Sequence, residues 1–463
     1  MGNVLRNIPS VNDLLESPPL RRLVDRANRT VVVSGIRKFL ENFRSEVHSA
    51  AAEINVPTVG ELAETIADWI LNEEQLPLRP VVNATGILLH TGLGRAPLAE
   101  AAIEAIARMS AGYASVEIDL ETGKRSQRVV AVEKLLRQVT GAEAAFVVNN
   151  NAGATLIALA AVAGGREVIV SRGQLIEIGG SFRLPDVMSA SGTVLREVGT
   201  TNKTRVEDYR DAITQDTAAL MRVHTSNFVV EGFTAEASLE ELIDLGKKRN
   251  LPVIDDIGSG ALVDFKKYGV DREPVASHSV KAGADLVLFS GDKLMGGPQC
   301  GIIVGNAALI EKIRKHPLAR ALRVDKIVLA ALAATLNIYR DPANAERYIP
   351  LLQLLSASEE NLKNRAERLA PQLESCNCVA AAEVLPDTTF LGGGSVPTQR
   401  IPTWTVALTP AKITLDTLSY KLRTGTPAVL GRIHKDQLIL DLRSVLPNQD
   451  RDLIQAVASI GEG

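Results

Sequence analysis

The fold of this chain is decided by one stretch: residues 286–301 read LVLFSGDKLMGGPQCG. The apolar run at 286–289 is short and ends at turn residues, which is typical of a buried strand in a parallel sheet. Lys293 follows this predicted strand, so we expect it at the carboxyl end of a sheet, the edge where open α/β folds bind ligands. We interpret the glycines after it as room for a bulky planar ligand. The alternative is a surface lysine in a glycine-rich loop.

A second stretch supplies an acid at another strand end. Residues 251–260 read LPVIDDIGSG, an apolar strand that runs into two acids and a Gly/Ser turn. A lysine and an acid at two strand ends suit pyridoxal phosphate (PLP), which binds a lysine as a Schiff base. Its pyridine nitrogen needs a carboxylate partner, because the protonated ring is the electron sink. We assign that role to Asp256. Asp255 is the rival, and either acid could instead cap a helix or turn.

A third stretch predicts a phosphate cradle. Residues 144–155 read AAFVVNNNAGAT, a strand, a polar turn and the start of a helix. The first N–H groups of a helix have no intrahelical partner, and the helix dipole adds positive potential there. The expected phosphate ligands are Asn151, Ala152 and Gly153.

A fourth strand end completes the predicted cofactor site. Residues 224–227 read HTSN and follow the strand-like run 218–223. Polar side chains at that position could bond the phenolic oxygen of the cofactor, and we select Ser226 and Asn227. Ser290, the last residue of the strand before the lysine loop, is the remaining expected cofactor contact.

Several motifs make the chain resemble a known family. They are LHTGLGRA at 89–96, VVNNNA at 147–152, VSRGQLIEIGGSFR at 170–183, VGTTN at 198–202 and SGDKLMGGPQCG at 290–301, with GRI at 431–433 and LDLR at 440–443. With these motifs the chain resembles the bacterial selenocysteine synthases, the L-seryl-tRNA(Sec) selenium transferases. The resemblance implies an α/β type I PLP-dependent transferase fold, a mainly parallel sheet with helices on both faces. It also implies conversion of seryl-tRNA(Sec) to selenocysteinyl-tRNA(Sec), with selenophosphate as the selenium donor.

The implied reaction gives roles to single residues. Lys293 would hold PLP as an internal aldimine and, once displaced by the serine amine, remove the Cα proton. Loss of the β-hydroxyl would leave an aminoacrylyl-tRNA, and Asp292 is the candidate acid for that step, with a turn cap as its alternative role. Arg95, Arg320 and Arg323 match arginines of the family that bind selenophosphate, and guanidinium forks suit a compact anion. On a helix, Arg320 and Arg323 would share a face.

Some assignments remain open at this stage. Type I PLP enzymes usually clamp a substrate carboxylate with an arginine, but a serine esterified to tRNA has no such charge. Arg432 and Arg443 are therefore either remnants of a clamp or structural. The side chain that stacks on the PLP ring is also open, with Gln174 or Leu175 as candidates.

Two other functions compete with this interpretation. A PLP enzyme acting on a free small substrate would have no use for a helical N-terminal domain. A non-catalytic tRNA-binding protein would be expected to have lost Lys293 or Asp256, and both are present.

Composition limits the remaining possibilities. The hydrophobic fraction of 46% predicts a soluble globular protein, and neither a signal peptide nor a membrane-spanning run is found. Three cysteines, Cys300, Cys376 and Cys378, do not make a disulfide framework or a metal site, so we expect a reducing cytoplasm. The net charge of −3 is unusual for a nucleic-acid binder, but eight basic against five acidic residues in the first 50 provide a modest local excess.

The pattern of predicted elements divides the chain into three domains. Residues 1–80 form a small helical domain and linker for tRNA binding, with helices around 36–47 and 61–71. Residues 81–340 form the PLP-binding α/β core, in which strands at 145–148, 167–171, 194–198, 218–223, 253–255 and 286–289 alternate with helices. Residues 341–463 form a smaller α+β domain with strands at 403–408, 428–433 and 437–442. The resemblance suggests a homodecameric ring of dimers.

Overall fold

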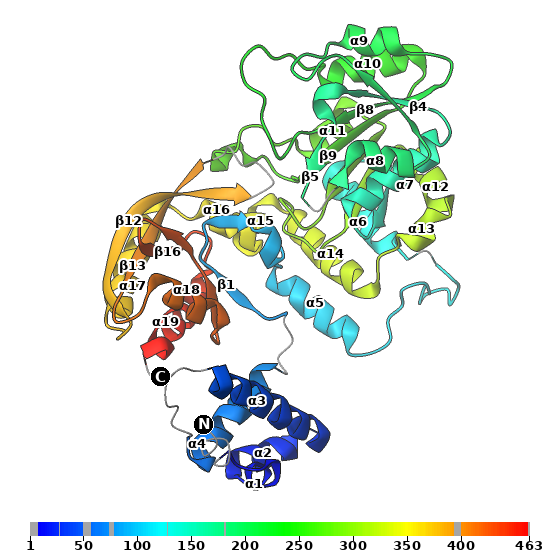
Figure 1. The fold of residues 1–463 in the computed structure, drawn as a ribbon. Coiled ribbons are helices and arrows are strands. Elements are labelled where there is room, and N and C mark those ends of the chain that lie inside the picture. Colours follow the sequence, from blue (N-terminus) through cyan, green and yellow to red (C-terminus); the bar gives the residue numbers. More distant parts are fainter. Residues whose placement is uncertain are drawn as a thin grey trace. The chain divides into compact units, whose positions relative to one another are not determined.

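The structure is a computed structural model that describes residues 8–26, 28–49, 57–73, 78–126, 128–179, 182–392 and 400–461 (Figure 1). The chain divides into two compact units, Met1–Pro80 and Val81–Gly463. Each unit is described by itself below.

The first unit is helical. It contains α1 (Val11–Leu15), α2 (Pro18–Arg26), α3 (Arg29–Ser49) and α4 (Val59–Glu73). The helices bury apolar side chains at helical spacing, such as Ile36 and Leu40 of α3 and Ile66 and Ile70 of α4. The two helices predicted from the sequence are confirmed as parts of α3 and α4. Their exposed charges differ: α4 presents the acids Glu61, Glu64 and Asp68, whereas α2 and α3 present the bases Arg21, Arg22 and Arg37 together with the acids Asp25 and Glu41.

The second unit is built on a sheet with seven described strands in the order β3-β11-β10-β9-β8-β4-β7. Their bounds are β3 (Ala144–Val148), β11 (Gly301–Gly305), β10 (Leu286–Ser290), β9 (Val253–Gly258), β8 (Thr217–Val223), β4 (Glu167–Ser171) and β7 (Val194–Val198). Within this sheet β11 runs antiparallel to both neighbours, and the other pairings are parallel. The six strands predicted for the core are confirmed. The strand β11 was not predicted, because its glycines at both ends suggested loop.

Helices cover both faces of this sheet, since β3, β10 and β11 are buried at every residue (Figure 1). The helices of this part are α5 (Glu100–Ser110), α6 (Val130–Thr140), α7 (Asn151–Ala163), α8 (Leu184–Ala190), α9 (Val206–Ala212), α10 (Leu239–Arg249), α11 (Ala276–Ala282), α12 (Ala307–Lys315), α13 (Leu318–Ala321), α14 (Lys326–Tyr339), α15 (Pro342–Tyr348) and α16 (Pro350–Ser356). A short hairpin joins β5 (Glu177–Ile178) to β6 (Phe182–Arg183).

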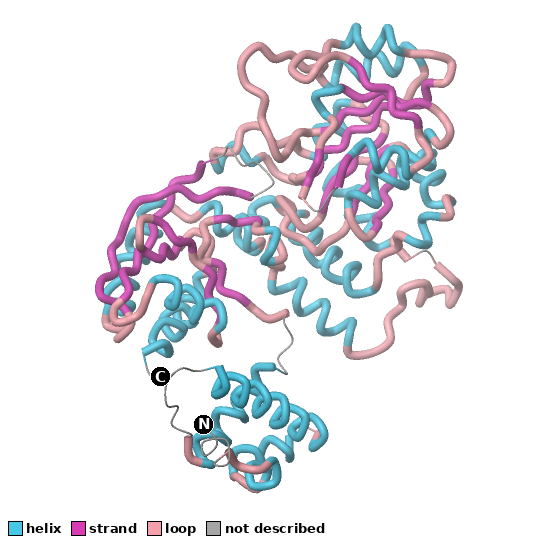
Figure 2. The backbone as a smooth tube through the Cα atoms, viewed as in Figure 1, coloured by secondary structure: helices cyan, strands magenta, loops and turns pink. Residues whose placement is uncertain are grey.

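A second sheet lies in the C-terminal part, as the strand colouring of Figure 2 shows. Its described strands are, in order, β15 (Arg432–His434), β16 (Gln437–Asp441), β13 (Arg400–Pro410), β12 (Val379–Gly392) and β2 (Ile87–Leu89). Apolar side chains of α17 (Glu359–Glu374), α18 (Leu415–Thr424) and α19 (Asp450–Ala458) belong to the same hydrophobic core as those of this sheet.

Two details of this region correct the predictions. Residues 81–89 were placed with the core, but β1 (Val81–Asn83) pairs with β14 (Ala428–Leu430) and β2 pairs with β12. The predicted strand 428–433 is two strands, because β14 pairs with β1 while β15 pairs with β16. Both errors involve pairing partners distant in sequence, which local patterns do not specify.

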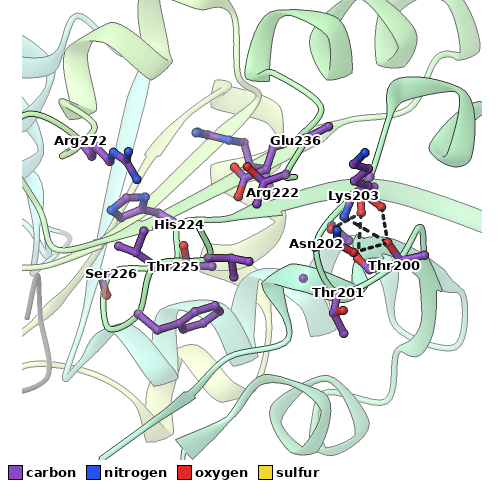
Figure 3. A pocket seen from close by; sticks show the side chains of 18 of the residues that line it. Thr200, Thr201, Asn202, Lys203, Arg222, His224, Thr225, Ser226, Glu236 and Arg272 are labelled. Atoms are coloured by element: carbon purple, nitrogen blue, oxygen red, sulfur yellow. Dashed lines mark hydrogen bonds between the residues drawn. The ribbon is translucent and has the colours of Figure 1, made fainter. Parts of the chain in front are cut away.

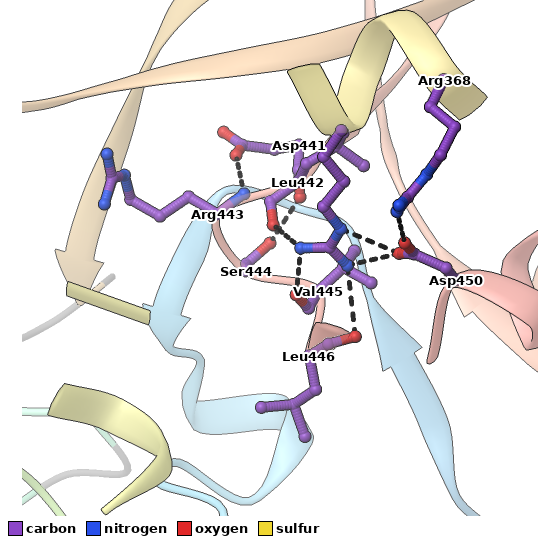
Figure 4. A network of polar contacts seen from close by, with 9 residues as sticks. Arg368, Asp441, Leu442, Arg443, Ser444, Val445, Leu446 and Asp450 are labelled. Carbon is purple, nitrogen blue, oxygen red and sulfur yellow. Dashed lines mark hydrogen bonds and ion pairs between the residues drawn. The ribbon is translucent and has the colours of Figure 1, made fainter. Parts of the chain in front are cut away.

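The arginines left open in this part have structural roles. Arg443 is buried and donates to the carbonyls of Leu354, Leu355 and Ala357 at the end of α16 and to Pro402. Arg432 is paired with Asp387. Arg365, on α17, donates to three carbonyls of the turn that follows β16, those of Leu442, Val445 and Leu446. It also pairs with the carboxylate of Asp450; these carbonyls and Asp450 are labelled in Figure 4. Arg443 therefore satisfies backbone carbonyls, and a remnant of a carboxylate clamp is not needed to explain it.

Candidate active site

Lys293 lies in the loop that joins β10 to β11 and is buried, with 7% of its surface exposed. The backbone at Lys293 and at the residue after it is hydrogen-bonded. The N–H of Leu294 donates to the carbonyl of Ser259 at 3.0 Å, and the N–H of Gly296 donates to the carbonyl of Lys293 at 2.9 Å. The lysine is therefore anchored to the turn that follows β9.

The glycines of this loop make room for the protein itself. A Cβ added at Gly296 would lie 2.5 Å from Cγ2 of Ile349, and one added at Gly297 would collide with Cε of Met295. At Gly301 it would collide with the carbonyl oxygen of Asn150, where β11 passes the start of α7. At these three positions the absence of a side chain is explained by contacts within the protein, and a role of the glycines in admitting a planar ligand stays a prediction.

Asp256 is a buried carboxylate near the end of β9, the strand beside β10. Its oxygens accept hydrogen bonds from Nδ2 of Asn151 at 2.9 Å, from Oγ1 of Thr155 at 2.9 Å and from the N–H of Gly258 at 3.1 Å. Asn151 and Thr155 are one turn apart on α7, so that helix holds the carboxylate in place. Because the donors satisfy both oxygens, the carboxylate has a fixed orientation.

Asp255 has different surroundings. Successive side chains of a strand point to opposite faces, so the two neighbouring acids are separated by the sheet. Asp255 is fully buried and pairs with Arg222 at 3.1 Å, while its Oδ2 has no hydrogen-bond partner. The two candidate partners of the ring nitrogen thus have different surroundings. Asp256 accepts hydrogen bonds from α7, the helix whose start is the predicted phosphate site, whereas Asp255 pairs with Arg222.

The charged groups around Lys293 shift its pKa in opposite directions. Burial lowers the pKa of the Lys293 amine, and the guanidinium of Arg95 lowers it further. The carboxylates of Asp292, Asp256 and Glu273 oppose this lowering. Burial likewise raises the pKa of Asp256, against the effect of its three hydrogen-bond donors. Lys293 and Asp256 are therefore close enough to interact electrostatically, and both are buried away from solvent.

The start of α7 has the geometry of a helix cap. Asn150 is the N-cap residue, and its Oδ1 accepts from the N–H of Gly153 at 2.8 Å. The N–H groups of Asn151 and Ala152 have no intrahelical acceptor at this end of a helix. Asn151 directs its amide nitrogen to Asp256, and its Oδ1 is buried without a partner. That Asn151, Ala152 and Gly153 hold a phosphate stays a prediction.

The strand end after β8 also carries polar atoms that the protein leaves unsatisfied. Ser226 is buried, and among the described residues neither its Oγ nor Oδ1 of Asn227 has a hydrogen-bond partner, although Nδ2 of Asn227 donates to the carbonyl of Glu177 at 2.7 Å. Buried polar atoms are nearly always paired, so these atoms fit a polar ligand. Ser226 lines a cavity of about 380 Å³ together with His224, Arg222 and Arg272 (Figure 3).

The predicted anion-binding arginines lie in two places. Nη1 of Arg95 is 2.7 Å from Oδ2 of Asp292, the residue before the lysine. Arg320 lies in α13, but Arg323 follows the end of that helix and pairs with Val148 in an isolated bridge. The predicted shared helix face is therefore wrong. Arg320 and Arg323 nevertheless line one cavity of about 320 Å³, and Arg95 is not among the described residues that line it.

Three residues of the site were missed by the analysis of the sequence. Thr155 contacts Asp256, and the spacing of four from Asn151 on a predicted helix could have indicated it. Glu273 and Ser259 contact each other beside the lysine loop. Ser259 stands in the predicted turn after β9, whereas nothing in the sequence around Glu273 points to the site. The candidates Gln174 and Leu175 lie after β4, and Oε1 of Gln174 accepts from the N–H of Val223 at 3.0 Å.

Comparison with known proteins decides the family. The family described as L-seryl-tRNA selenium transferase matches residues 81–446, and the one described as selenocysteine synthase N terminal matches residues 5–44. The chain belongs to the L-seryl-tRNA selenium transferase family.

Relatives of this family match the whole chain. The L-seryl-tRNA(Sec) selenium transferase of Moorella thermoacetica is 46% identical over 462 residues, covering 100% of this chain and 98% of the relative. That of Geobacter sulfurreducens is 44% identical and covers 99% of both. That of Clostridium botulinum strain Okra is 45% identical and covers 96% and 95%.

The fold has a solved counterpart. The structure of D-glucosaminate-6-phosphate ammonia-lyase has a TM-score of 0.57 and 20% identity, and the match covers 84% of this chain and 98% of the lyase. At that identity the likeness concerns the fold, and it agrees with the predicted type I architecture. In the described residues no helix is both long and apolar enough to cross a membrane, and no His, Cys, Asp or Glu side chains gather as a metal site.

Proposed function

We propose that the site around Lys293 carries out the family's reaction with selenophosphate as the selenium donor and with the residues named below. The activity itself follows from family membership: the chain converts L-seryl-tRNA(Sec) to L-selenocysteinyl-tRNA(Sec), with pyridoxal phosphate as cofactor. The observation that best supports the assignment of the site is the burial of Lys293, in the loop that follows β10, together with Asp256 on neighbouring β9, whose carboxylate is held by α7.

When bound, PLP supplies an electron sink for negative charge at the serine Cα. Lys293 would hold the cofactor and afterwards take up the Cα proton on its amine nitrogen. Its lowered pKa supports this role, because the neutral amine is the form that accepts a proton and a lower pKa favours that form. Asp256 would face the ring nitrogen, with Asn151 and Thr155 fixing its orientation.

The unsatisfied polar atoms would complete the cofactor site. We assign Ser226 and Asn227 to the phenolic oxygen of the cofactor and the start of α7 at residues 151–153 to the phosphate. The N–H of Gly153 donates to Oδ1 of Asn150 in the structure, so it would have to exchange that partner for the phosphate. Ser290, buried at the end of β10, is the remaining contact.

Asp292 and Arg95 are proposed to act together. Nη1 of Arg95 is 2.7 Å from Oδ2 of Asp292, so the guanidinium occupies that carboxylate. An anionic selenium donor would compete with Asp292 for the guanidinium of Arg95. Binding of the donor would thereby free Asp292 to relay the proton taken up by the Lys293 amine to the departing hydroxyl, which would leave as water.

Arg320 and Arg323 are proposed as the other donor-binding cations. Their cavity also contains Arg125 and Arg128, which are paired with Glu117, and Arg314, which is paired with Glu133 and Glu311. We therefore assign the anionic donor to Arg320 and Arg323 rather than to these three arginines. The segment that carries them is bonded to the strand leading into α7, because the N–H of Asn149 donates to the carbonyl of Leu322 at 2.9 Å. That places the two arginines beside the proposed phosphate cradle.

The remaining parts of the proposal concern partners and place. The helical first unit, through the basic side of α2 and α3, would contact the tRNA. Assembly as a homodecameric ring of dimers and residence in the cytoplasm are proposed from the resemblance to the family.

The test is incubation of the purified chain with seryl-tRNA(Sec) and selenophosphate, scored for selenocysteinyl-tRNA by mass spectrometry of the released amino acid. Selenocysteine should form with the wild type and not with Lys293→Ala. Formation with thiophosphate but not with selenophosphate would contradict the proposed donor.

A further inference from the structure

Glu273 is a buried carboxylate near the lysine loop that has no role in the proposed reaction. It lies in the loop before α11, next to exposed Arg272, yet its own side chain is 2% exposed. A buried carboxylate is costly unless partners stabilise it, so its position calls for an explanation.

Both oxygens of Glu273 are engaged by residues at strand ends. Oε1 is 3.3 Å from Nε2 of His224, which follows β8, and Oε2 accepts a hydrogen bond from Oγ of Ser259, which follows β9. The carbonyl of Ser259 in turn accepts from the N–H of Leu294, the residue after the lysine. One carboxylate thus links two strand ends to the lysine loop.

We propose that Glu273 is a positioning residue of the lysine site: it holds His224 and Ser259 in place and sets a fixed negative charge beside Lys293. The inference rests on the proposed function, because it concerns the same lysine. It adds a residue outside every predicted motif, contributed by a loop that precedes α11.

Three carboxylates oppose the lowering of the Lys293 pKa by burial and by Arg95: Asp292, Asp256 and Glu273, with Glu273 contributing least. Asp292 is paired with Arg95, and Asp256 accepts hydrogen bonds from three donors. Glu273 is held by the hydroxyl of Ser259 and the imidazole of His224, so its carboxylate has a fixed place at the strand ends.

Glu273→Gln is the informative variant because it keeps the shape and removes the charge. A glutamine oxygen can still accept from Ser259, while its NH₂ group would face His224 and select the imidazole tautomer with a bare Nε2. Without the negative charge, the ammonium form of Lys293 loses a stabilising partner, so the lysine should give up its proton at a lower pH. Two control variants accompany it. Glu273→Asp keeps the charge, and Glu236→Gln removes an exposed carboxylate from the cavity that Glu273 lines together with His224 and Ser226.

The experiment measures Lys293 in protein stripped of cofactor. Trace acetic anhydride is added across a pH series, and acetylation of Lys293 is read by mass spectrometry against exposed Lys315 as internal reference. The reactivity curve of Lys293 should move to lower pH in Glu273→Gln and stay near the wild type in Glu273→Asp and Glu236→Gln. A curve for Glu273→Gln that coincides with the wild type would overturn the charge part of the inference.

Ser259→Ala provides the second test, and it does not depend on how Glu273→Gln folds. It removes one contact and keeps the charge, so loaded protein should lose cofactor faster on dialysis, while the acetylation curve stays in place. An unchanged rate of loss would overturn the positioning part. Failure of the proposed function looks different: borohydride would then not fix PLP on Lys293 in the wild type, whatever the variants do.

Discussion

Burial moves the pKa of Lys293 down and the pKa of Asp256 up, so both charged forms are disfavoured by the same poorly solvated place. Each therefore depends on the other and on the hydrogen bonds around it. This is the arrangement in which single substitutions have large effects, because removing one partner leaves the other buried and uncompensated.

The first prediction at this scale concerns the lysine. Lys293→Ala should abolish turnover, because both the covalent attachment and the proposed base are lost. Purified wild type should be yellow, and borohydride should fix the cofactor on the peptide that contains Lys293. A label on another lysine would contradict the assignment.

The second prediction separates the neighbouring acids. Asp256→Ala should cost roughly 3–5 kcal/mol of transition-state stabilisation, the range for a broken buried charge pair, which is about two to four orders of magnitude in kcat. Asp255→Ala is the matched control: it should act mainly on stability, through its pair with Arg222. Steady-state rates and unfolding temperatures of both variants check this. A larger loss of kcat in Asp255→Ala would reverse the assignment.

At the scale of elements, the sequence predicted what local patterns encode. The core strands are continuous apolar runs ended by turn residues, and the site residues stand at their carboxyl ends, so both could be found without a structure. The strand β11 was hidden by its glycines, β1 and β2 by partners far along the chain, and Glu273 by a loop without a pattern. The contacts that the glycines after Lys293 make within the protein, with Ile349, Met295 and Asn150, come from distant parts of the chain and could not be predicted from the sequence.

The third prediction belongs to the elements that carry the arginines. Arg320→Ala and Arg323→Ala should raise KM for selenophosphate by about tenfold or more, since charge-assisted hydrogen bonds contribute roughly 1.5–3 kcal/mol each. Exchange of the serine Cα hydrogen with solvent deuterium should persist, because that step precedes use of the donor. Lys315→Ala, an exposed cation of neighbouring α12, is the control. Loss of the exchange itself would show that these arginines act earlier.

At the scale of the whole molecule, we propose that the two units divide the work that the reaction needs, with tRNA binding in the first and the cofactor in the second. The residues proposed to hold the cofactor lie in Val81–Gly463, whereas Met1–Pro80 has a helical core of its own. Distinguishing one tRNA from others requires contacts far from the amino acid, and RNA offers mainly phosphate for such contacts.

The fourth prediction tests this division. Deleting residues 1–80 should leave PLP bound and sharply weaken tRNA(Sec) binding. In the full chain, Arg21→Ala with Arg22→Ala should weaken binding and make its salt dependence less steep by about one unit per lost phosphate contact. Glu61→Gln with Glu64→Gln, on the acidic side of α4, should not weaken it. Equal affinity of the truncated and intact chains, measured by fluorescence anisotropy over a salt series, would assign the first unit to assembly instead.

The pairing of β1 with β14 also constrains how the chain folds as it is made. Val81 lies beside Ala428, so the first strand of the second unit must wait for nearly the last one to leave the ribosome. At roughly 5–20 residues per second this wait is on the order of tens of seconds. The large sheet, whose strands lie between Ala144 and Gly305, can close long before that. During translation, β1 and β2 therefore remain exposed edges next to a finished core, and we expect this interval to be when nascent chains depend most on a chaperone.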